Sequence, residues 1–525
     1  MPHHGRRPKR SQVQHRPGLV RRCRHSLDPN RLLANCKYNT LLVGSHTPSA
    51  DTLSSQFWQR PETAEHVFET ITPSDLRTMR DNPKSFNNFE TLILTVSLRL
   101  IHLRTADHDL FDKDPSTFIR EALNCVRILT RVLPFVYECD RLCAWEQDFF
   151  WASTDKLPPS DLAPTCLGVE LIDSLLDMAF WSGFTLPINM HGNNGPTYGF
   201  WQSGIAYERR LETSKEFESR RTEIMQLLLV LESKCIYKPA NAFTTFGSEA
   251  IDFISNHHDR KKVQYLLCSL LNTVLKYQPD ARYLSPSPRE LHETHVRTCL
   301  HFLQVNLLNR TPWAEASAPP DNRFRDLFSH LHKATHLQFL ADGILKILRQ
   351  PLEANSNGLN IVQRPLVWAH EIIPLLWESL YSNKYFRAFI CETGRQFELT
   401  VFLLFYILDP NKNVEGVKRV SLLCVQTMSE NPEYAISLNK PFEGHDNLPS
   451  FMQIKNFHGS YADYLFTVSH LARSRLSSCT NTSLSGYLLF SNPRRMVTWM
   501  LWLPHWLGSL SMSRPIFLTS VGPQV

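Results

Sequence analysis

The chain has 525 residues, of which 42% are hydrophobic and 11% aromatic. This composition excludes a protein that is disordered over its whole length, because it offers enough apolar surface for a large core. Glycine is scarce, at 19 residues. That scarcity disfavours nucleotide-binding α/β enzymes and β-sandwiches, since both classes place glycine at tight turns and phosphate loops.

The net charge of +6 is concentrated near the start of the chain, where residues 1–25 carry eight Arg or Lys and no acid. The rest of the chain contains 48 of the 56 Lys and Arg and all 50 Asp and Glu. It is therefore almost neutral, and its charge gives no reason to expect a polyanionic partner. Three interpretations of the basic residues 6–24 stay open. They bind anionic lipid headgroups, they form a nuclear-localisation or nucleic-acid patch, or they have no function.

The twelve cysteines predict reduced thiols in a cytosolic protein. They are scattered without a CxxC pair, and the closest two are Cys139 and Cys143. No apolar run follows the charged start, so we expect no secretory signal.

Residues 1–52 are rich in Pro, His, Arg and Ser and develop no helical period, which predicts a disordered basic segment. We expect order to begin near Phe57 and Trp58. Residues 72–75 read Thr-Pro-Ser-Asp. A proline and an acid in the first turn are typical of a helix start, so we predict one here.

Residues 53–475 form a succession of apolar segments at helical spacing. Between Leu123 and Val136 apolar residues recur every three or four positions, which predicts a helix that Pro134 kinks or ends. A second clear period covers residues 266–275. Further helices are expected at about 168–181, 219–237, 289–308, 322–350, 366–382, 395–408, 415–430 and 460–474.

Strand signals are weak, so we predict an all-α protein of stacked helix hairpins, an α-solenoid of the HEAT or armadillo kind. Residues 476–525 are expected to be a divergent, poorly ordered tail. Surface loops between hairpins are predicted where Pro, Asn, Gly or Ser accumulate. These stretches are residues 184–215, 238–247, 278–288, 311–321 and 351–365.

Two apolar segments are too short for membrane spans, which need about 20 residues. Residues 397–408 are predicted to be a fully buried helix. Residues 496–512 contain three tryptophans and follow Arg494 and Arg495. This second segment fits a core or tail better than an interfacial helix, although the interfacial interpretation stays open.

Catalytic signatures are missing: the sequence contains no GxxxxGK[ST], GxGxxG or GxSxG motif. His292 and His295 resemble a zincin pair, but their spacing is i, i+3 where a metal pair on a helix needs i, i+4. His332 and His336, in a histidine-rich stretch that begins at His330, have that spacing on one expected helix face. Core residues surround them, so ordinary hydrogen-bonded histidines are the default interpretation.

Acidic residues at 107–109 and 112–114 precede an expected helix start at Pro115. They predict a solvated loop with acids near a helix N-terminus. We therefore expect no enzymatic activity, no catalytic residue, no cofactor, no resident metal and no small-molecule substrate.

Residues 124–138 read NCVRILTRVLPFVYE. This block is similar to a helix of the high-temperature-induced dauer-formation (HID) family, and it is the first of a series of blocks that resemble that family. The resemblance covers roughly residues 55–473. The other blocks follow in the family's order at residues 146–151, 221–229, 237–239, 270–274, 277–279, 338–344, 437–442 and 459–463.

The resemblance implies a non-enzymatic, peripheral membrane scaffold of the cytosol and Golgi that takes part in secretory traffic and cargo sorting. Its partners would be the Golgi membrane surface and trafficking proteins, with no nucleic acid expected. Animal members carry a myristoyl group on a glycine after Met1, whereas this chain has Pro2. The alternative is a nuclear or nucleic-acid-associated adaptor that uses the basic N-terminus.

Overall fold

Helices are the main elements in the part of the chain that the computed structural model describes. No named strand occurs in that part, and its β-pairing is limited to isolated bridges. The all-α prediction is confirmed. The described residues are 63–105, 108–152, 166–188, 195–209, 211, 214–238, 247–257, 259–278, 286–309, 322–356, 365–409 and 415–476.

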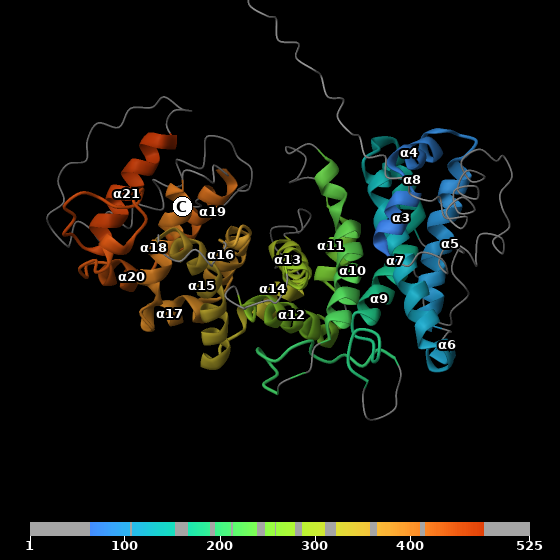
Figure 1. Ribbon diagram of the computed structural model, residues 1–525, viewed down its shortest axis with the longest axis horizontal. Coiled ribbons are helices and arrows are strands. Elements are labelled where there is room, and N and C mark those ends of the chain that lie inside the picture. The colour runs from blue at the N-terminus through green and yellow to red at the C-terminus, as the bar shows by residue number, and fades with distance from the viewer. Residues whose placement is uncertain are drawn as a thin grey trace, which may run out of the picture.

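The helices follow one another across the molecule in chain order, from the blue N-terminal end to the red C-terminal end in Figure 1. This order is the packing pattern of a stacked helical array. The N-terminal third contains α3 (Ala64–Thr70), α4 (Pro73–Asp81), α5 (Phe86–Thr105), α6 (His108–Lys113), α7 (Pro115–Tyr137), η1 (Asp140–Leu142), α8 (Cys143–Glu146) and η2 (Gln147–Trp151).

The central and C-terminal thirds continue the array. The centre contains α9 (Leu167–Met178), α10 (Lys215–Glu232), η3 (Ser233–Tyr237), α11 (Glu249–Ser255), α12 (Arg260–Leu275), α13 (Pro286–Leu308) and α14 (Arg323–Ser329). The C-terminal third contains α15 (Ala334–Ser356), η5 (Ala369–Ile372), α16 (Ile373–Ser382), α17 (Lys384–Glu392), α18 (Arg395–Leu408), α19 (Glu415–Ser429), α20 (Pro432–Ser437), η6 (His445–Asn447) and α21 (Tyr461–Leu476).

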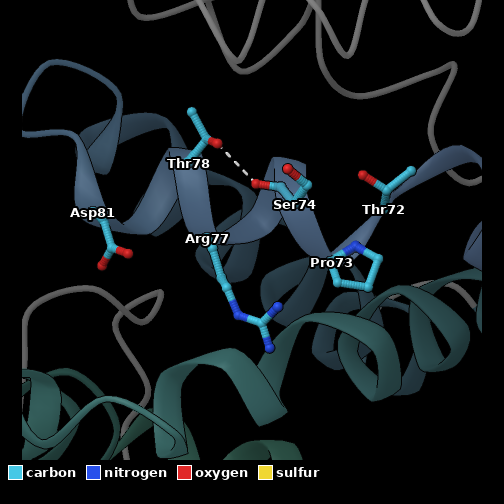
Figure 2. Close-up of a pocket in the computed structure, with 6 residues that line it drawn as sticks. All are labelled: Thr72, Pro73, Ser74, Arg77, Thr78 and Asp81. Atoms are coloured by element: carbon cyan, nitrogen blue, oxygen red, sulfur yellow. Dashed lines mark hydrogen bonds between the residues drawn. The ribbon is translucent and has the colours of Figure 1, made fainter.

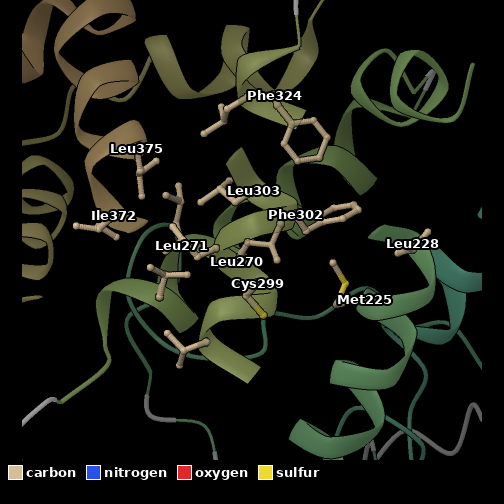
Figure 3. Packing of buried hydrophobic residues seen from close by; sticks show 14 of the residues in the cluster. Met225, Leu228, Leu270, Leu271, Cys299, Phe302, Leu303, Phe324, Ile372 and Leu375 are labelled. Atoms are coloured by element: carbon tan, nitrogen blue, oxygen red, sulfur yellow. The ribbon is translucent and has the colours of Figure 1, made fainter. Parts of the chain in front are cut away.

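One continuous hydrophobic core runs through the stack, from Val67 to Val468. At its centre α13 packs against α10, α12, α14 and α16. Figure 3 shows Phe302 and Leu303 of α13 among side chains from α10, α12 and α14. Because each helix buries its apolar face against its neighbours, burial of apolar surface holds the array together.

Two predicted helix starts are confirmed. Thr72 caps α4 in a capping box with Asp75, which satisfies two backbone N–H groups at that end. Asp114 accepts a hydrogen bond from the backbone N–H of Thr117 at 3.1 Å, and Pro115 occupies the first turn of α7. Pro134 lies in the last turn of α7, which ends three residues later, as the sequence predicted.

The single helix predicted over 322–350 is wrong, because the structure breaks it between α14 and α15 at residues 330–333. The side-chain amide of Asn383 donates to the carbonyl oxygens of Phe328 at 2.9 Å and Leu331 at 3.0 Å. A side chain that lies about 50 residues further along the chain therefore satisfies the end of α14.

The loop predicted over 351–365 is also partly wrong, since α15 continues to Ser356 with Pro351 inside it. Pro351 is buried and Leu352 packs against the core. Tertiary packing thus maintains the helix through a residue that removes one backbone donor.

The acidic stretch expected to be a solvated loop contains the short helix α6 (His108–Lys113) instead. Phe111 explains the difference. Its side chain is 4% exposed and packs edge-on against Phe118, with ring centroids 5.1 Å apart. An apolar anchor between the acids fixes this turn against α7.

The helix predicted over residues 397–408 is confirmed as α18, and every residue from Leu399 to Leu408 is buried. No helix in the described ranges combines the length and the hydropathy that a bilayer crossing requires. The predictions of a disordered segment over residues 1–52 and of a poorly ordered tail over residues 476–525 lie outside the described residues, apart from Leu476, the last residue of α21. The same holds for the apolar segment 496–512.

Candidate functional site

The histidines that the sequence singled out lie in two separate places. His292 and His295 are both on α13 but contact different groups. The Nδ1 atom of His292 lies 3.1 Å from a carboxylate oxygen of Glu218, whereas Nδ1 of His295 lies 2.8 Å from the hydroxyl of Thr222. The two rings therefore have independent structural roles between α10 and α13.

The three histidines at 330–336 do not form one face. His332 lies in the connection between α14 and α15, and His336 lies in the first turn of α15, so the shared helix face predicted for them is wrong. His330 and His332 contact nearby backbone carbonyls, at 2.6 and 2.8 Å. Nε2 of His336 accepts a hydrogen bond from the backbone N–H of Ala206 at 3.3 Å. Within the described residues, no three His, Cys, Asp or Glu side chains converge in a group that could hold a metal ion.

His295 is 1% exposed, and burial beside Arg221 lowers its pKa to about 3. The unfolded chain binds a proton below the ordinary pKa of 6.5 while the folded protein does not. Stability conferred by neutral His295 is therefore complete above pH 6.5 and is lost as the pH falls towards 3, at on the order of 1 kcal/mol per pH unit.

We expect the variant H295Q to lose less stability than the wild type between pH 7 and pH 5, because glutamine does not titrate. Urea unfolding at both pH values measures this difference. H66Q, which changes an exposed histidine on α3, is the matched control. An unchanged pH dependence in H295Q would contradict the assignment of a neutral buried His295.

A surface hollow of about 620 Å³ lies along α4. Figure 2 shows Arg77 extending from α4 towards α7, and the hydroxyl of Thr78 donates to the carbonyl oxygen of Ser74 at 2.8 Å. Arg77 pairs with Glu138 at 2.8 Å. The polar groups here serve the contact between α4 and α7, and the hollow contains no nucleophile with an adjacent base. The lining residues are Thr72, Pro73, Ser74, Arg77, Thr78 and Asp81.

The prediction of a surface loop over residues 184–215 is wrong for much of the described part of that segment. Phe184 and Ile205 are fully buried, and Trp201 is 1% exposed. The indole N–H of Trp201 donates to the carbonyl oxygen of Ala179 at 3.0 Å. Large apolar side chains between polar residues draw this irregular segment into the core, where side chains satisfy its backbone.

Asn272 of α12 holds that segment in place. Its side-chain oxygen accepts from the N–H of Ile205 at 2.7 Å, and its amide donates to the carbonyl oxygens of Gln202 and Ile205 at 3.0 and 3.2 Å. Gly204 has φ +148°, and a Cβ atom there would lie 2.5 Å from the side-chain oxygen of Asn272. Only glycine fits this close approach.

A charged network joins the same segment to three helices. The carboxylate of Asp177 on α9 accepts from Arg104 on α5 at 2.7 Å and from Lys262 on α12 at 2.8 Å. It also accepts from the hydroxyl of Tyr198. Burial and the negative charge of Asp177 raise the pKa of Tyr198 well above its ordinary value. This network positions the segment 195–207, which the sequence analysis missed.

The polar clusters considered above have structural roles: they contact backbone groups, pair charges between neighbouring helices and hold the buried segment. None of them combines a nucleophile, a base and an open cavity in the arrangement that bond-breaking requires. The signal for the buried segment was present in the sequence, as Trp201 beside Gly204 in a stretch without helical period.

Comparisons with known proteins identify the family. The model of the high-temperature-induced dauer-formation protein family matches residues 40–488, a range that contains all the described helices. No solved structure matches the chain.

Several curated relatives share the match. A Hid-1 family protein of Schizosaccharomyces pombe is 26% identical over 79% of this chain and 52% of its own length. The Ubp5-interacting protein ftp105 of the same yeast is 26% identical over 82% of this chain and 56% of its own length. Protein HID1 of Homo sapiens is 23% identical over 80% of this chain and 56% of its own length.

The chain spans about half the length of these relatives. The names of these relatives refer to the family or to an interaction, and none of the three refers to a chemical reaction. Because the family model matches most of the chain, the resemblance seen in the sequence blocks is confirmed. The protein belongs to the high-temperature-induced dauer-formation protein family.

Proposed function

We propose that this protein is a non-enzymatic scaffold that attaches peripherally to Golgi membranes and takes part in secretory traffic and cargo sorting. The observation that carries the proposal is the family match over residues 40–488, together with a helical stack whose described part shares one hydrophobic core from Val67 to Val468. Stacked helices present an extended surface to partners, and their rigid core supports binding without a catalytic centre.

The polar clusters support this role. Several of the described ion pairs join one helix to another, as Arg104 joins α5 to α9 and Arg325 joins α14 to α16. The name of the relative ftp105 refers to an interaction with Ubp5. Since this member of the same family is named for its interaction with another protein, we infer that the present chain also acts by binding partners.

The test is the position of the full-length chain, tagged at its C-terminus, in cells that lack the untagged protein. We expect the signal to overlap medial and trans Golgi markers, and deletion of the gene to missort a secreted reporter. A diffuse signal with normal sorting would contradict the proposal. Accumulation in the nucleus, abolished when the eight basic residues between 6 and 24 are replaced by serine, would favour the adaptor interpretation instead.

A further inference from the structure

Two exposed tyrosines stand at the corner where α16 meets α17. Tyr381 is 50% exposed and Tyr385 is 43% exposed. The ring of Tyr381 stacks on Trp377, with centroids 5.3 Å apart, and that of Tyr385 lies 5.9 Å from His332. We call this group, together with Lys333 and Lys384, the aromatic corner. Figure 1 labels α16 and α17, the two helices that carry its tyrosines.

The aromatic corner is rigid. Asn383, between the two helices, is fully buried and donates to the carbonyl oxygens of Phe328 and Leu331. Its own side-chain oxygen accepts from the N–H of Phe386 at 2.9 Å. Because this residue fixes the turn to the end of α14, the tyrosines project from a pre-organised surface.

The charge of the aromatic corner is positive. Lys333 and Lys384 are exposed, and neither has a carboxylate within 4.0 Å among the described residues. The ammonium group of Lys384 lies 5.1 Å from the ring centre of Tyr385. Of the acids in this region, Asp326 of α14 pairs with Arg260 at 2.9 Å, and Glu208 interacts electrostatically with His336, as Lys333 does.

The arrangement of Lys384 does not serve helix stability. It occupies the first turn of α17, and that turn contains no acid. A cation at a helix N-terminus is unfavourable, since the helix dipole is positive there. Lys384 and the helix end thus reinforce each other's attraction for anions.

We propose that the aromatic corner docks on an anionic lipid bilayer surface. This inference rests on the proposed peripheral attachment and names the surface that provides it. Tyrosine and tryptophan prefer the boundary between headgroups and acyl chains, because their rings are apolar and carry a polar tip. Lysines beside them add attraction to anionic headgroups. The combination matches a bilayer interface in both polarity and charge.

The test uses the purified full chain and vesicles of equimolar phosphatidylcholine and phosphatidylserine, with pure phosphatidylcholine vesicles for comparison. We expect K333E/K384E to weaken partitioning into the anionic vesicles by on the order of tenfold or more. The control variant K84E/K261E changes two exposed lysines elsewhere and alters the net charge by the same amount. We expect its partitioning into anionic vesicles to fall much less.

The aromatic contribution is tested separately. Y381S/Y385S is expected to reduce partitioning several-fold, since interfacial burial of the rings is lost. L291S/I436S removes two side chains that are 65% and 62% exposed, on α13 and α20, and serves as the control. Hydroxyl-radical footprinting is expected to show Tyr381 and Tyr385 protected when anionic vesicles are added.

Equal losses in the corner variants and in their controls would overturn the inference, as would unprotected tyrosines in the vesicle-bound chain. Protection by an acidic polypeptide but not by vesicles would overturn it in favour of a protein partner. In cells, a wild-type chain that stays diffuse contradicts the proposed function itself. A Golgi-bound wild type whose K333E/K384E variant remains equally bound contradicts only the aromatic corner.

Discussion

Replacing Glu378 with glutamine is expected to lower the free energy of unfolding by about 3 kcal/mol. Glu378 is fully buried on α16 and pairs with Arg325 of α14 at 2.8 Å. E378Q keeps the shape of the side chain but leaves the guanidinium of Arg325 without its buried counter-charge. The loss is large because a charge far from water has few other ways to be neutralised.

The same substitution at Glu232 is expected to have the opposite sign at neutral pH. Glu232 is 3% exposed and receives a hydrogen bond from the amide of Asn306 at 2.7 Å. No cation pairs with it among the described residues, and its second oxygen has no hydrogen-bond partner there. Burial raises the pKa of this carboxyl well above its ordinary 4.5.

The pH dependence follows from this shift. Above pH 4.5 the unfolded chain releases the proton of Glu232 while the folded protein retains it. The unfolded state thus binds fewer protons, and stability falls as the pH rises from there towards the folded pKa. E232Q removes this loss, so it should be at least as stable as the wild type at pH 8 and should show a weaker pH dependence.

Urea unfolding of the wild type, E378Q and E232Q at pH 5.5 and pH 8 measures both effects. The two variants are matched controls for each other, because the substitution is the same, both carboxyls are buried, and only Glu378 pairs with a cation among the described residues. Similar destabilisation of both variants at pH 8 would show that the ion pair with Arg325 does not decide the outcome.

Replacing Asn272 with aspartate should release the buried segment 195–207 from α12. The side-chain amide of Asn272 donates to two carbonyl oxygens, and aspartate would oppose both of them with an oxygen. Two donors are lost and a buried charge is created, so we expect a loss of about 3 kcal/mol or more. Trp201, which lies in the segment, should become accessible to solvent.

Hydrogen exchange read on peptides that cover residues 198–209 tests this local effect, and urea unfolding tests the global one. N87D is the control, since Asn87 is exposed in the first turn of α5, where an acid is tolerated. Unchanged exchange in the N272D segment would mean that Asn272 does not hold it.

The long helices show how far the sequence alone reaches. Its prediction for residues 395–408 agrees with α18 at both ends. The continuous apolar run of residues 401–408 stops at Asp409 and Pro410, which leaves little choice for the C-terminal boundary. The helix α5 (Phe86–Thr105) is missing from the predicted helices. Yet its buried residues recur at three- and four-residue steps from Phe89 to Leu100, so the sequence carried that signal too.

Irregular elements behave differently. The break between α14 and α15 depends on Asn383, and the short helix α6 depends on Phe111. In both cases the deciding contact comes from another element. Local propensity predicted a continuous helix where the chain breaks between α14 and α15, and a loop where α6 forms. Propensity contains no information about contacts with other elements.

The sequence by itself determined the all-α class and the family, because helical periodicity and ordered blocks are properties of neighbouring residues. Only the tertiary structure decided that the segment 195–207 is buried, and that His295 is kept neutral. The partners that decide these features lie on other elements: Asn272 lies 67 residues from Ile205, and Arg221, which lowers the pKa of His295 together with burial, lies on α10 whereas His295 lies on α13. Burial is a property of the packed chain as a whole, so no local pattern encodes it.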